Sequence, residues 1–490
     1  MNQTLILNPK DNVGVALSEC SRGLIADGVE LNEDIPQGHK FSLKKIQKNE
    51  SIIKYGNIIG YAVSEIPAGS HVHTHNTRTS LGDHSTYRFD QTTYRHNNTG
   101  KDTFMGYPRF DGQVGIRNEL WIIVLVGCVN AIADAMIHRF TKKHPTLDID
   151  GVYTFAHPYG CSQMGEDHEL TKRILQNMVH HPNAGGVLIL GLGCENNQLG
   201  SFMESLGQVD TARIRTLVSQ EVDDEISVGV EMLEELYIVM KEDIRVPVSV
   251  EKLVIGLKCG GSDGLSGVTA NPLVGWVSDY FIAQGGSALL TEVPEMFGAE
   301  QILMNRAKNE DIYRKTVKMI NDFKQYYIDH DQVVYENPSP GNKVGGITTL
   351  EDKSLGCIQK AGQSDVSDVL EYGDRCNVKG LTLISGPGND IVATTLLGAA
   401  GAQIVLFTTG RGTPFGGFIP TLKISSNSEI ARMKPHWIDY DAGSLVNEKT
   451  MDEAGMELAK MILDVASGEY VKNELNENRE IAIFKQGVTL

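Results

Sequence analysis

The sequence contains no apolar run long enough to span a membrane, which excludes one whole class of protein. A membrane-spanning helix needs about 20 consecutive apolar residues, and no stretch of the 490 residues approaches that length. The first residues, MNQTLILNPKDN, contain neither the basic start nor the apolar core of a signal peptide. We therefore expect a cytoplasmic protein.

Positive charge and cysteine are also scarce. The 44 lysines and arginines face 62 aspartates and glutamates, and the net charge of −18 argues against nucleic acid or an anionic membrane as the main partner. Seven cysteines are few and odd in number, which fits free thiols or metal ligands in a reducing compartment better than a disulfide framework. With 41% hydrophobic and 22% charged residues, the chain has the composition of an ordinary globular protein with more than one domain.

The spacing of apolar residues differs between the first part of the chain and the rest. The first part contains only short strand-like runs separated by Pro-x-Gly turns, which predicts a small all-β domain. A polar, aperiodic stretch follows, and after it strand-like and helix-like segments alternate, which is typical of α/β domains with mostly parallel sheets. The run VPVSVEK near Pro247 indicates a joint between two such domains. The predicted parts are a β-domain at 1–82, a linker at 83–104, and α/β domains at 105–248 and 249–490.

Four cysteines occur in the same sequence context: each lies where a short apolar run ends in glycine-rich sequence. These runs are typical of buried parallel strands, and ligands of open α/β sheets bind just beyond the carboxyl ends of the strands. We therefore expect the four thiols to meet at one site and to serve as metal ligands, with small buried core residues as the alternative. The four are Cys128, Cys161, Cys194 and Cys259.

Alternating histidines follow a Pro-x-Gly turn as His71, His73 and His75. In an extended strand, alternate residues face the same side, so the imidazoles would line one side and could ligate iron, manganese or zinc. The alternative is a solvated polar strand. We predict His71 and His73 as metal ligands and leave His75 out, because the strand is expected to end there.

Other polar residues lie in turns or glycine-rich loops next to strand-like runs. Histidine, lysine, tyrosine and carboxylates in such places suit proton transfer, whereas basic residues in glycine-rich loops suit carboxylate binding. The alternative for each is a surface residue in a turn. The predicted catalytic residues are His39, Lys40, Tyr55, Asp263 and Glu292, and the predicted substrate-binding residues are Ser262, Asn271, Lys343 and Arg411.

The glycine-rich loops lack the signatures of nucleotide binding. The loop CGGSDGLSG is not closed by Gly-Lys-Ser/Thr, and GLGCEN has Asn196 where the third glycine of a dinucleotide fingerprint would stand. This argues against a nicotinamide-dependent dehydrogenase.

Long motifs across nearly the whole chain resemble the altronate/galactarate dehydratase family of sugar-acid hydro-lyases. The motifs are GHKFSLKKI, YGNIIGYA, GYPRFDGQVGIRN, HPYGCSQ, GLGCENNQ, CGGSDGLSGVTANP, TEVPEMFGAEQ, ENPSPGNKVGG and FTTGRGTPFGGFIP. The resemblance implies an N-terminal β-clip domain of the SAF type and dependence on Fe²⁺ or Mn²⁺. It also implies loss of water from D-altronate to give 2-dehydro-3-deoxy-D-gluconate in hexuronate catabolism, because HVHTHNTRT and NELWIIVLVGCVN fit the altronate branch better than the galactarate one.

The chemistry of such a dehydration explains the residue types. Removing the proton next to a carboxylate creates a dianionic enediolate that a divalent cation stabilises, and the leaving hydroxyl needs an acid or the same metal. We expect the site where the β-domain docks on the carboxyl edge of the sheet. Two kinds of metal centre remain as alternatives: a single Fe²⁺ or Mn²⁺ ion, or an iron–sulfur cluster on the cysteines.

The expected partner is a small sugar acid. The sequence leaves open whether the chain forms a homo-oligomer. The alternative functions are dehydration of another aldonate or aldarate such as galactarate, and non-catalytic binding of a sugar acid.

Overall fold

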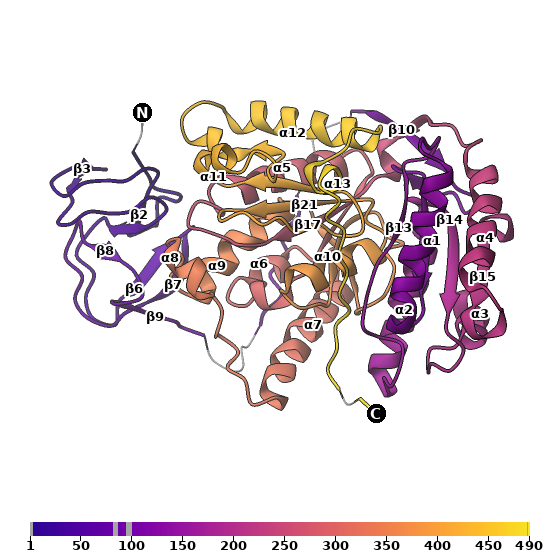
Figure 1. Cartoon of the computed structure of the whole chain (residues 1–490). Helices are drawn as coiled ribbons and strands as arrows, with labels where there is room; N and C mark the ends of the chain where they lie inside the picture. The colour runs from indigo at the N-terminus through magenta and orange to yellow at the C-terminus, as the bar shows by residue number, and fades with distance from the viewer. Residues whose placement is uncertain (1–2, 82–86, 95–99, 488) are drawn as a thin grey trace.

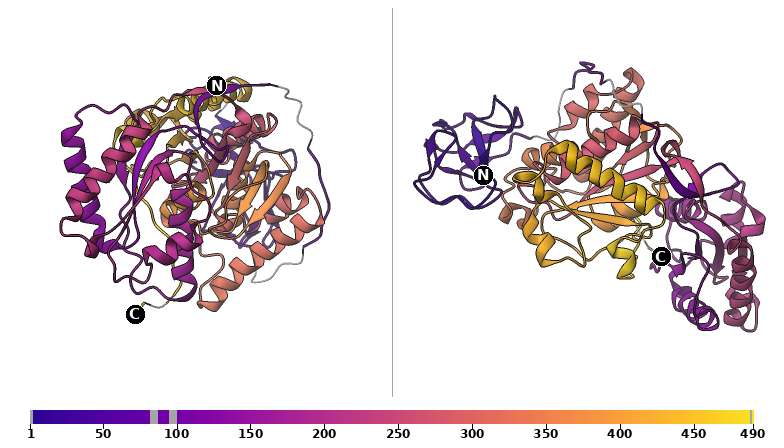
Figure 2. Two further views of the ribbon diagram at one scale, coloured as in Figure 1. Left: turned by 90° about the vertical axis from the view of Figure 1, so that its right-hand side faces the viewer. Right: turned by 90° about the horizontal axis from the view of Figure 1, so that it is seen from above.

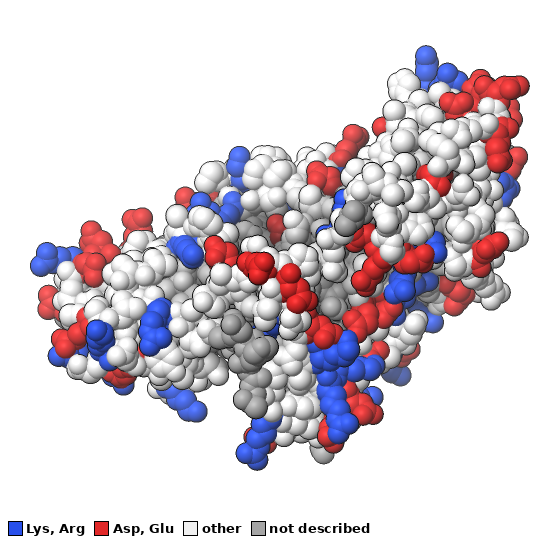
Figure 3. Space-filling model, turned by 90° about the horizontal axis from the view of Figure 1, so that it is seen from below, with Lys and Arg blue, Asp and Glu red and all other residues white. Residues whose placement is uncertain are grey.

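The computed structural model describes residues 3–81, 87–94, 100–487 and 489–490. Three parts lie in a row, with the N-terminal strands at one end, the segment around α1 and α4 at the other, and the C-terminal part between them (Figure 1). The view from above shows the same order (Figure 2, right). On the face in Figure 3, lysine and arginine side chains lie among acidic ones.

The N-terminal part consists of short antiparallel strands, which confirms the predicted all-β domain. Its sheets have the orders β1-β2-β5-β8, β6-β7-β9 and β3-β4. Buried apolar residues such as Ile52, Ile59 and Val72 point into its centre. The strands are β1 (Thr4–Leu5), β2 (Val13–Ala16), β3 (Ile25–Ala26), β4 (Val29–Glu30), β5 (Lys40–Ser42), β6 (Ser51–Lys54), β7 (Asn57–Ala62), β8 (His71–Val72) and β9 (Thr77–Arg78).

The second part is a four-stranded parallel sheet of order β13-β12-β14-β15 with helices on both faces. Its central strands are continuous apolar runs because both faces are covered. Its strands are β12 (Glu119–Val124), β13 (Gly151–Thr154), β14 (Ala184–Gly191) and β15 (Ile214–Val218). Its helices are α1 (Asn130–Lys143), α2 (Gly165–Val179), α3 (Leu199–Leu206) and α4 (Glu225–Met240).

A small antiparallel sheet marks where the chain enters and leaves this second part. It joins β10 (Thr103–Pro108) to β11 (Val114–Gly115) and to β16 (Val246–Ser249). Strand β10 thus begins inside the stretch predicted as a linker, and residues 87–94 of that stretch pack on the third part, where Phe89 stacks on Tyr313. The domain boundaries given above stay a prediction.

The third part is a seven-stranded parallel sheet of order β19-β20-β18-β17-β21-β22-β23, in agreement with the predicted α/β class. Its strands are β17 (Val254–Cys259), β18 (Ser287–Leu290), β19 (Val366–Leu370), β20 (Gly380–Ile384), β21 (Ile404–Thr409), β22 (Thr421–Ser425) and β23 (Tyr440–Asp441). Its helices are α5 (Ala270–Ile282), α6 (Glu300–Asn305), α7 (Glu310–Asp329), α8 (Pro340–Val344), α9 (Leu350–Cys357), α10 (Asp390–Ala399), α11 (Ser428–Met433), α12 (Met451–Ala466) and α13 (Lys472–Leu475). Within the described ranges, no helix combines the length and the apolar character that crossing a bilayer requires.

Candidate functional site

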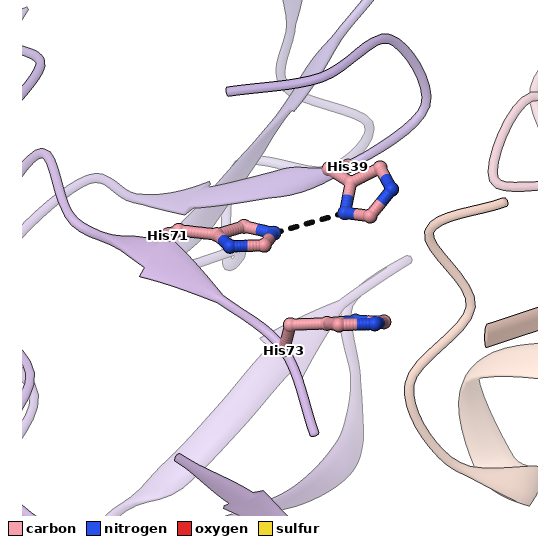
Figure 4. A group of neighbouring side chains, drawn as sticks. All are labelled: His39, His71 and His73. Carbon is pink, nitrogen blue, oxygen red and sulfur yellow. Dashed lines mark hydrogen bonds between the residues drawn. The ribbon is translucent and has the colours of Figure 1, made fainter. Parts of the chain in front are cut away.

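Three imidazoles gather on the N-terminal domain where it faces the third part (Figure 4). Antiparallel pairing of β5 with β8 sets Phe41 opposite His71 and so brings His39, just before β5, next to His71. His39 Nδ1 lies 2.9 Å from His71 Nε2, and the ring of His73 is 5.0 Å from that of His39 and 5.4 Å from that of His71. One nitrogen of each ring lies within 4.8 Å of the other two, so this triad could hold a metal ion.

The surroundings keep these imidazoles neutral. Burial, helped by the neighbouring imidazoles and Lys40, lowers the pKa of His71 to about 3 and that of His73 to about 4. Burial also lowers the pKa of His39. Neutral imidazole is the form that ligates metals, so the donor set fits a divalent cation. His75 lies next to His71, at a ring distance of 5.6 Å, and is not part of the triad.

The N-terminal domain is fixed to the third part by a buried ionic bridge. Asp352 of α9 accepts from Lys40 Nζ at 2.8 Å and from Lys54 Nζ at 3.0 Å, and all three side chains are at most 2% exposed. Lys40 also donates to the carbonyl oxygen of Gly346. Burial alone would raise the pKa of Asp352, but the two ammonium groups hold it well below its usual range. Lys40 thus positions the triad against the third part.

A cleft of about 560 Å³ opens between the two parts beside the triad. It is lined by three predicted residues, His39, Asp263 and Arg411. The Arg411 side chain is exposed and has no ion-pair partner in the part of the chain that the structure describes. Such a free guanidinium can bind a carboxylate through two hydrogen bonds.

Asp263 is held firmly at the wall of this cleft. Its Oδ1 accepts from the backbone N–H and hydroxyl of Ser266 at 2.8 Å and from Ser426 Oγ at 2.7 Å, whereas Oδ2 accepts from Asn427 Nδ2 at 3.0 Å. A carboxylate has about four lone-pair sites, so Oδ2 keeps a free one for a ligand hydroxyl. Lys343 lies in α8 directly before Val344, which lines the cleft.

A second, smaller hollow lies behind the cleft. It is lined by Asp263 together with the predicted residues Tyr55, Ser262 and Asn271. Burial raises the pKa of the Tyr55 phenol. Asn271 is engaged internally, since its amide donates to the carbonyl oxygen of Gly356 and accepts from Thr408. These residues therefore lie near the cleft but outside the triad.

Glu292 lines neither hollow and lies in a fully buried ionic network. It contacts Lys258 and accepts from Lys360 Nζ at 3.0 Å and from the backbone N–H of Cys259 at 3.1 Å. Cys259 is buried as well, with its sulfur 2.8 Å from Ser262 Oγ. The geometry therefore favours a structural role for Glu292 over the predicted catalytic one.

The expected meeting of all four strand-end thiols with the histidines does not occur. Cys128, Cys161 and Cys194 follow strands of the second part, at the end of the molecule opposite the N-terminal domain (Figure 1). Cys259 is the last residue of β17 in the third part, and no thiol belongs to the imidazole group. The physical reason is that the four strands belong to two different sheets with separate carboxyl edges.

Sequence reasoning missed two features of this site. It assigned His39 to proton transfer, although the motif Gly-His-Lys before a strand was the available signal for a ligand near the histidine run. It did not consider Lys54 and Asp352, for which the sequence offers no signal, because Lys54 and Asp352 are 298 residues apart.

Family models match the chain in three consecutive stretches. A model described as the altronate/galactarate dehydratase SAF domain matches residues 2–80. The second domain of D-galactarate dehydratase/altronate hydrolase matches 106–241, and the C-terminal model of D-galactarate/altronate dehydratase matches 250–489.

Curated proteins match over all or nearly all of their length. The chain is 55% identical to the altronate dehydratase of Bacillus subtilis over 502 residues and 54% identical to that of Escherichia coli over 494 residues, with 100% of each chain covered. The galactarate dehydratase (L-threo-forming) of Escherichia coli is 34% identical over 508 residues, covering 97% of this chain and 95% of that protein.

Proposed function

The chain belongs to the D-galactarate/altronate dehydratase family, and from this premise we propose that the cleft beside the histidine triad is where it removes water from altronate. The predicted family, the hydro-lyase class and the altronate substrate are confirmed by the full-length relatives. One observation carries the location of the chemistry: His39 of the triad lines the same cleft as Arg411.

His39, His71 and His73 would hold the cation, and Fe²⁺ or Mn²⁺ are the ions that we propose. When bound, such an ion supplies positive charge that stabilises the enediolate formed at the substrate carboxylate. The imidazoles need no deprotonation step at neutral pH, because burial already keeps His71 and His73 uncharged through a lowered pKa.

The remaining residues of the cleft bind and orient the sugar acid. Arg411 binds the substrate carboxylate, and Asp263 accepts a hydrogen bond from a substrate hydroxyl through Oδ2. The cleft volume of about 560 Å³ lies within the range of small-ligand sites. We propose Tyr55 and Lys343 as further polar groups around the bound acid, on the basis of their positions beside the cleft.

The test is a product assay with a matched histidine control. Protein is incubated with D-altronate and Fe²⁺ or Mn²⁺ without added nicotinamide, and formation of the 2-keto acid is followed. The double variant His71→Ala/His73→Ala should lose bound metal and activity together. The His75→Ala variant, altered beside but outside the triad, should keep both. A double variant that is active and retains metal would reject this site, and faster turnover of galactarate would reject the substrate.

A further inference from the structure

Three thiols follow neighbouring strands of the second domain, away from the site described above. Cys128, Cys161 and Cys194 follow β12, β13 and β14, which are neighbours in the sheet, and all three are free and exposed. Each precedes a helix: Cys128 lies in a short 3₁₀ turn before α1, Cys161 lies before α2, and Cys194 lies before α3. Exposed thiols are prone to oxidation, so three at one edge of a sheet require an explanation.

The three loops that carry these cysteines form one connected surface. The backbone N–H of Gly127 donates to the carbonyl oxygen of Tyr159 at 2.9 Å, and that of Asn197 donates to Gly160 at 3.1 Å. Gly160 has a φ of 95°, and a Cβ at this position would collide with the carbonyl oxygen of Leu125. The loops are therefore pressed together so closely that only glycine fits at their contact.

In or directly after each of these loops, an amide side chain has only one of its two polar ends hydrogen-bonded. The amide nitrogens of Asn130 and Asn197 donate to backbone oxygens of neighbouring loops at 3.0 and 3.1 Å, and Gln163 Oε1 accepts a backbone N–H at 3.1 Å. The other ends, Asn130 Oδ1, Asn197 Oδ1 and Gln163 Nε2, are buried and have no hydrogen-bond partner among the described residues. Gln163 is 4% exposed and Asn197 is fully buried.

The residues that carry these unpaired atoms lie close to the cysteines in the sequence. Asn130, Gln163 and Asn197 stand two, two and three residues after Cys128, Cys161 and Cys194. Leaving a buried polar atom unpaired costs about 1–3 kcal/mol, and most such atoms in proteins find a partner. Three of them on the same loops as three exposed thiols indicate that a further polar group belongs at this edge.

The spacing of the thiols argues against a single metal ion shared by all three sulfurs. Thiolates bound to one zinc ion at 2.3 Å lie about 3.8 Å apart, whereas the three sulfurs are not among the groups of ligand atoms lying within 4.8 Å of one another in the described chain. An iron–sulfur cluster is wider, because each thiolate binds a different iron. The helices α1, α2 and α3 begin directly after the cysteine loops, and their amino ends favour the negative charge of bound thiolates.

We propose that Cys128, Cys161 and Cys194 bind a four-iron, four-sulfide cluster through three thiolates, which leaves one iron open to a ligand other than cysteine. Cys259 does not take part, because it is buried in the third part. The cluster would lie at the end of the molecule opposite the histidine triad (Figure 1). The proposal therefore does not rest on the proposed catalytic site.

The test compares cluster loading of full-length variants. Protein is reconstituted without oxygen with iron salts, sulfide and a thiol reductant, and bound iron, acid-labile sulfide and visible absorption are measured. The parent and a Cys376→Ser control, which alters a half-buried thiol of the third part, should bind iron and sulfide in equal amounts. The triple variant Cys128→Ser/Cys161→Ser/Cys194→Ser should lose both. Iron without labile sulfide in the parent, or equal sulfide in the triple variant, would overturn the proposal.

A second measurement needs no variant and so does not depend on how the triple variant folds. Alkylation of the loaded parent protein, mapped by mass spectrometry, should spare Cys128, Cys161 and Cys194, and removal of iron by a chelator should expose them. Equal alkylation before and after chelation would contradict the cluster. The His71→Ala/His73→Ala variant should keep its labile sulfide, so failure at the triad and failure at the cysteines are told apart.

Discussion

Replacing Asp352 with asparagine tests how the N-terminal domain is held in place. The carboxylate contacts Lys40 at 2.8 Å and Lys54 at 3.0 Å, and neither ammonium group has access to water. Asparagine keeps the size of the side chain and removes its charge. Two buried ammonium groups then face a neutral amide in an environment that screens charge poorly.

The expected cost follows from the burial of this bridge. Removing one partner of a buried ion pair destabilises proteins by about 3–5 kcal/mol. Burial already lowers the pKa of Lys40 to about 8, so this lysine can release its proton when the carboxylate is lost, which limits the damage. We therefore expect Asp352→Asn to lose about 3 kcal/mol at pH 7, at the lower end of that range.

The sign of the pH dependence provides a second check. In the variant, a lysine whose pKa in the folded state lies below its unfolded value makes folding more favourable as the pH rises. Asp352→Asn should therefore regain part of its lost stability between about pH 7 and 9. In the parent protein, the lowered pKa of Asp352 contributes stability above the unfolded pKa of 3.8 that is lost as the pH falls below it.

The assay is urea unfolding followed by circular dichroism, together with the metal content of the folded protein. The matched control is Glu310→Gln, which breaks the ion pair with Arg314, whose two side chains are 65% and 71% exposed. The control should change stability by less than about 0.5 kcal/mol. A decrease of less than about 1 kcal/mol in the free energy of unfolding of Asp352→Asn would refute the reasoning, because loss of one partner of a buried ion pair should cost more than this.

Three further substitutions test the cleft, the buried network and a separate titrating group. Arg411→Ala should raise KM for altronate by about 10- to 150-fold with little change in kcat, because a hydrogen bond to a charged group is worth about 1.5–3 kcal/mol; an unchanged KM would contradict carboxylate binding. Glu292→Gln should destabilise the fold by about 3 kcal/mol in urea unfolding, because Lys258 and Lys360 lose their shared carboxylate; loss of activity with unchanged stability would instead support the catalytic role predicted from the sequence. Burial raises the pKa of Asp439 from 3.8 to about 6, so this group favours folding below pH 4, and that contribution is lost as the pH rises through 6. Asp439→Asn should remove up to about 3 kcal/mol of this pH dependence. Parallel curves of stability against pH for the parent and the variant would contradict this prediction.

The fold class followed from local patterns alone. Short β-branched runs between Pro-x-Gly turns predicted the N-terminal strands, and alternating strand and helix segments predicted the parallel sheets, because these signals depend only on neighbouring residues. His71 and His73 were predicted as ligands for the same reason, since alternation along an extended chain places them on one side.

The rest of the site depends on contacts between distant segments. His39 becomes a member of the triad only because β5 pairs with β8 in the register that sets Phe41 opposite His71. Cys128, Cys194 and Cys259 lie at or within four residues of a strand end as predicted, whereas β13 ends seven residues before Cys161, and the sheet edge that each cysteine joins depends on strand order. Cys259 belongs to a different sheet from Cys128, a separation that the predicted joint near Pro247 already implied but that the prediction of one common thiol site ignored.

The bridge at Asp352 has a consequence for how the protein is made. Lys40 and Asp352 are 312 residues apart, and a ribosome adds about 5–20 residues per second, so the nascent N-terminal domain waits roughly 15–60 s for its docking surface. During that interval both ammonium groups face water, and the histidines stand beside no cleft. The bridge can form once helix α9 leaves the exit tunnel, but the cleft is completed later still, because Arg411 lies 59 residues after Asp352 in the chain.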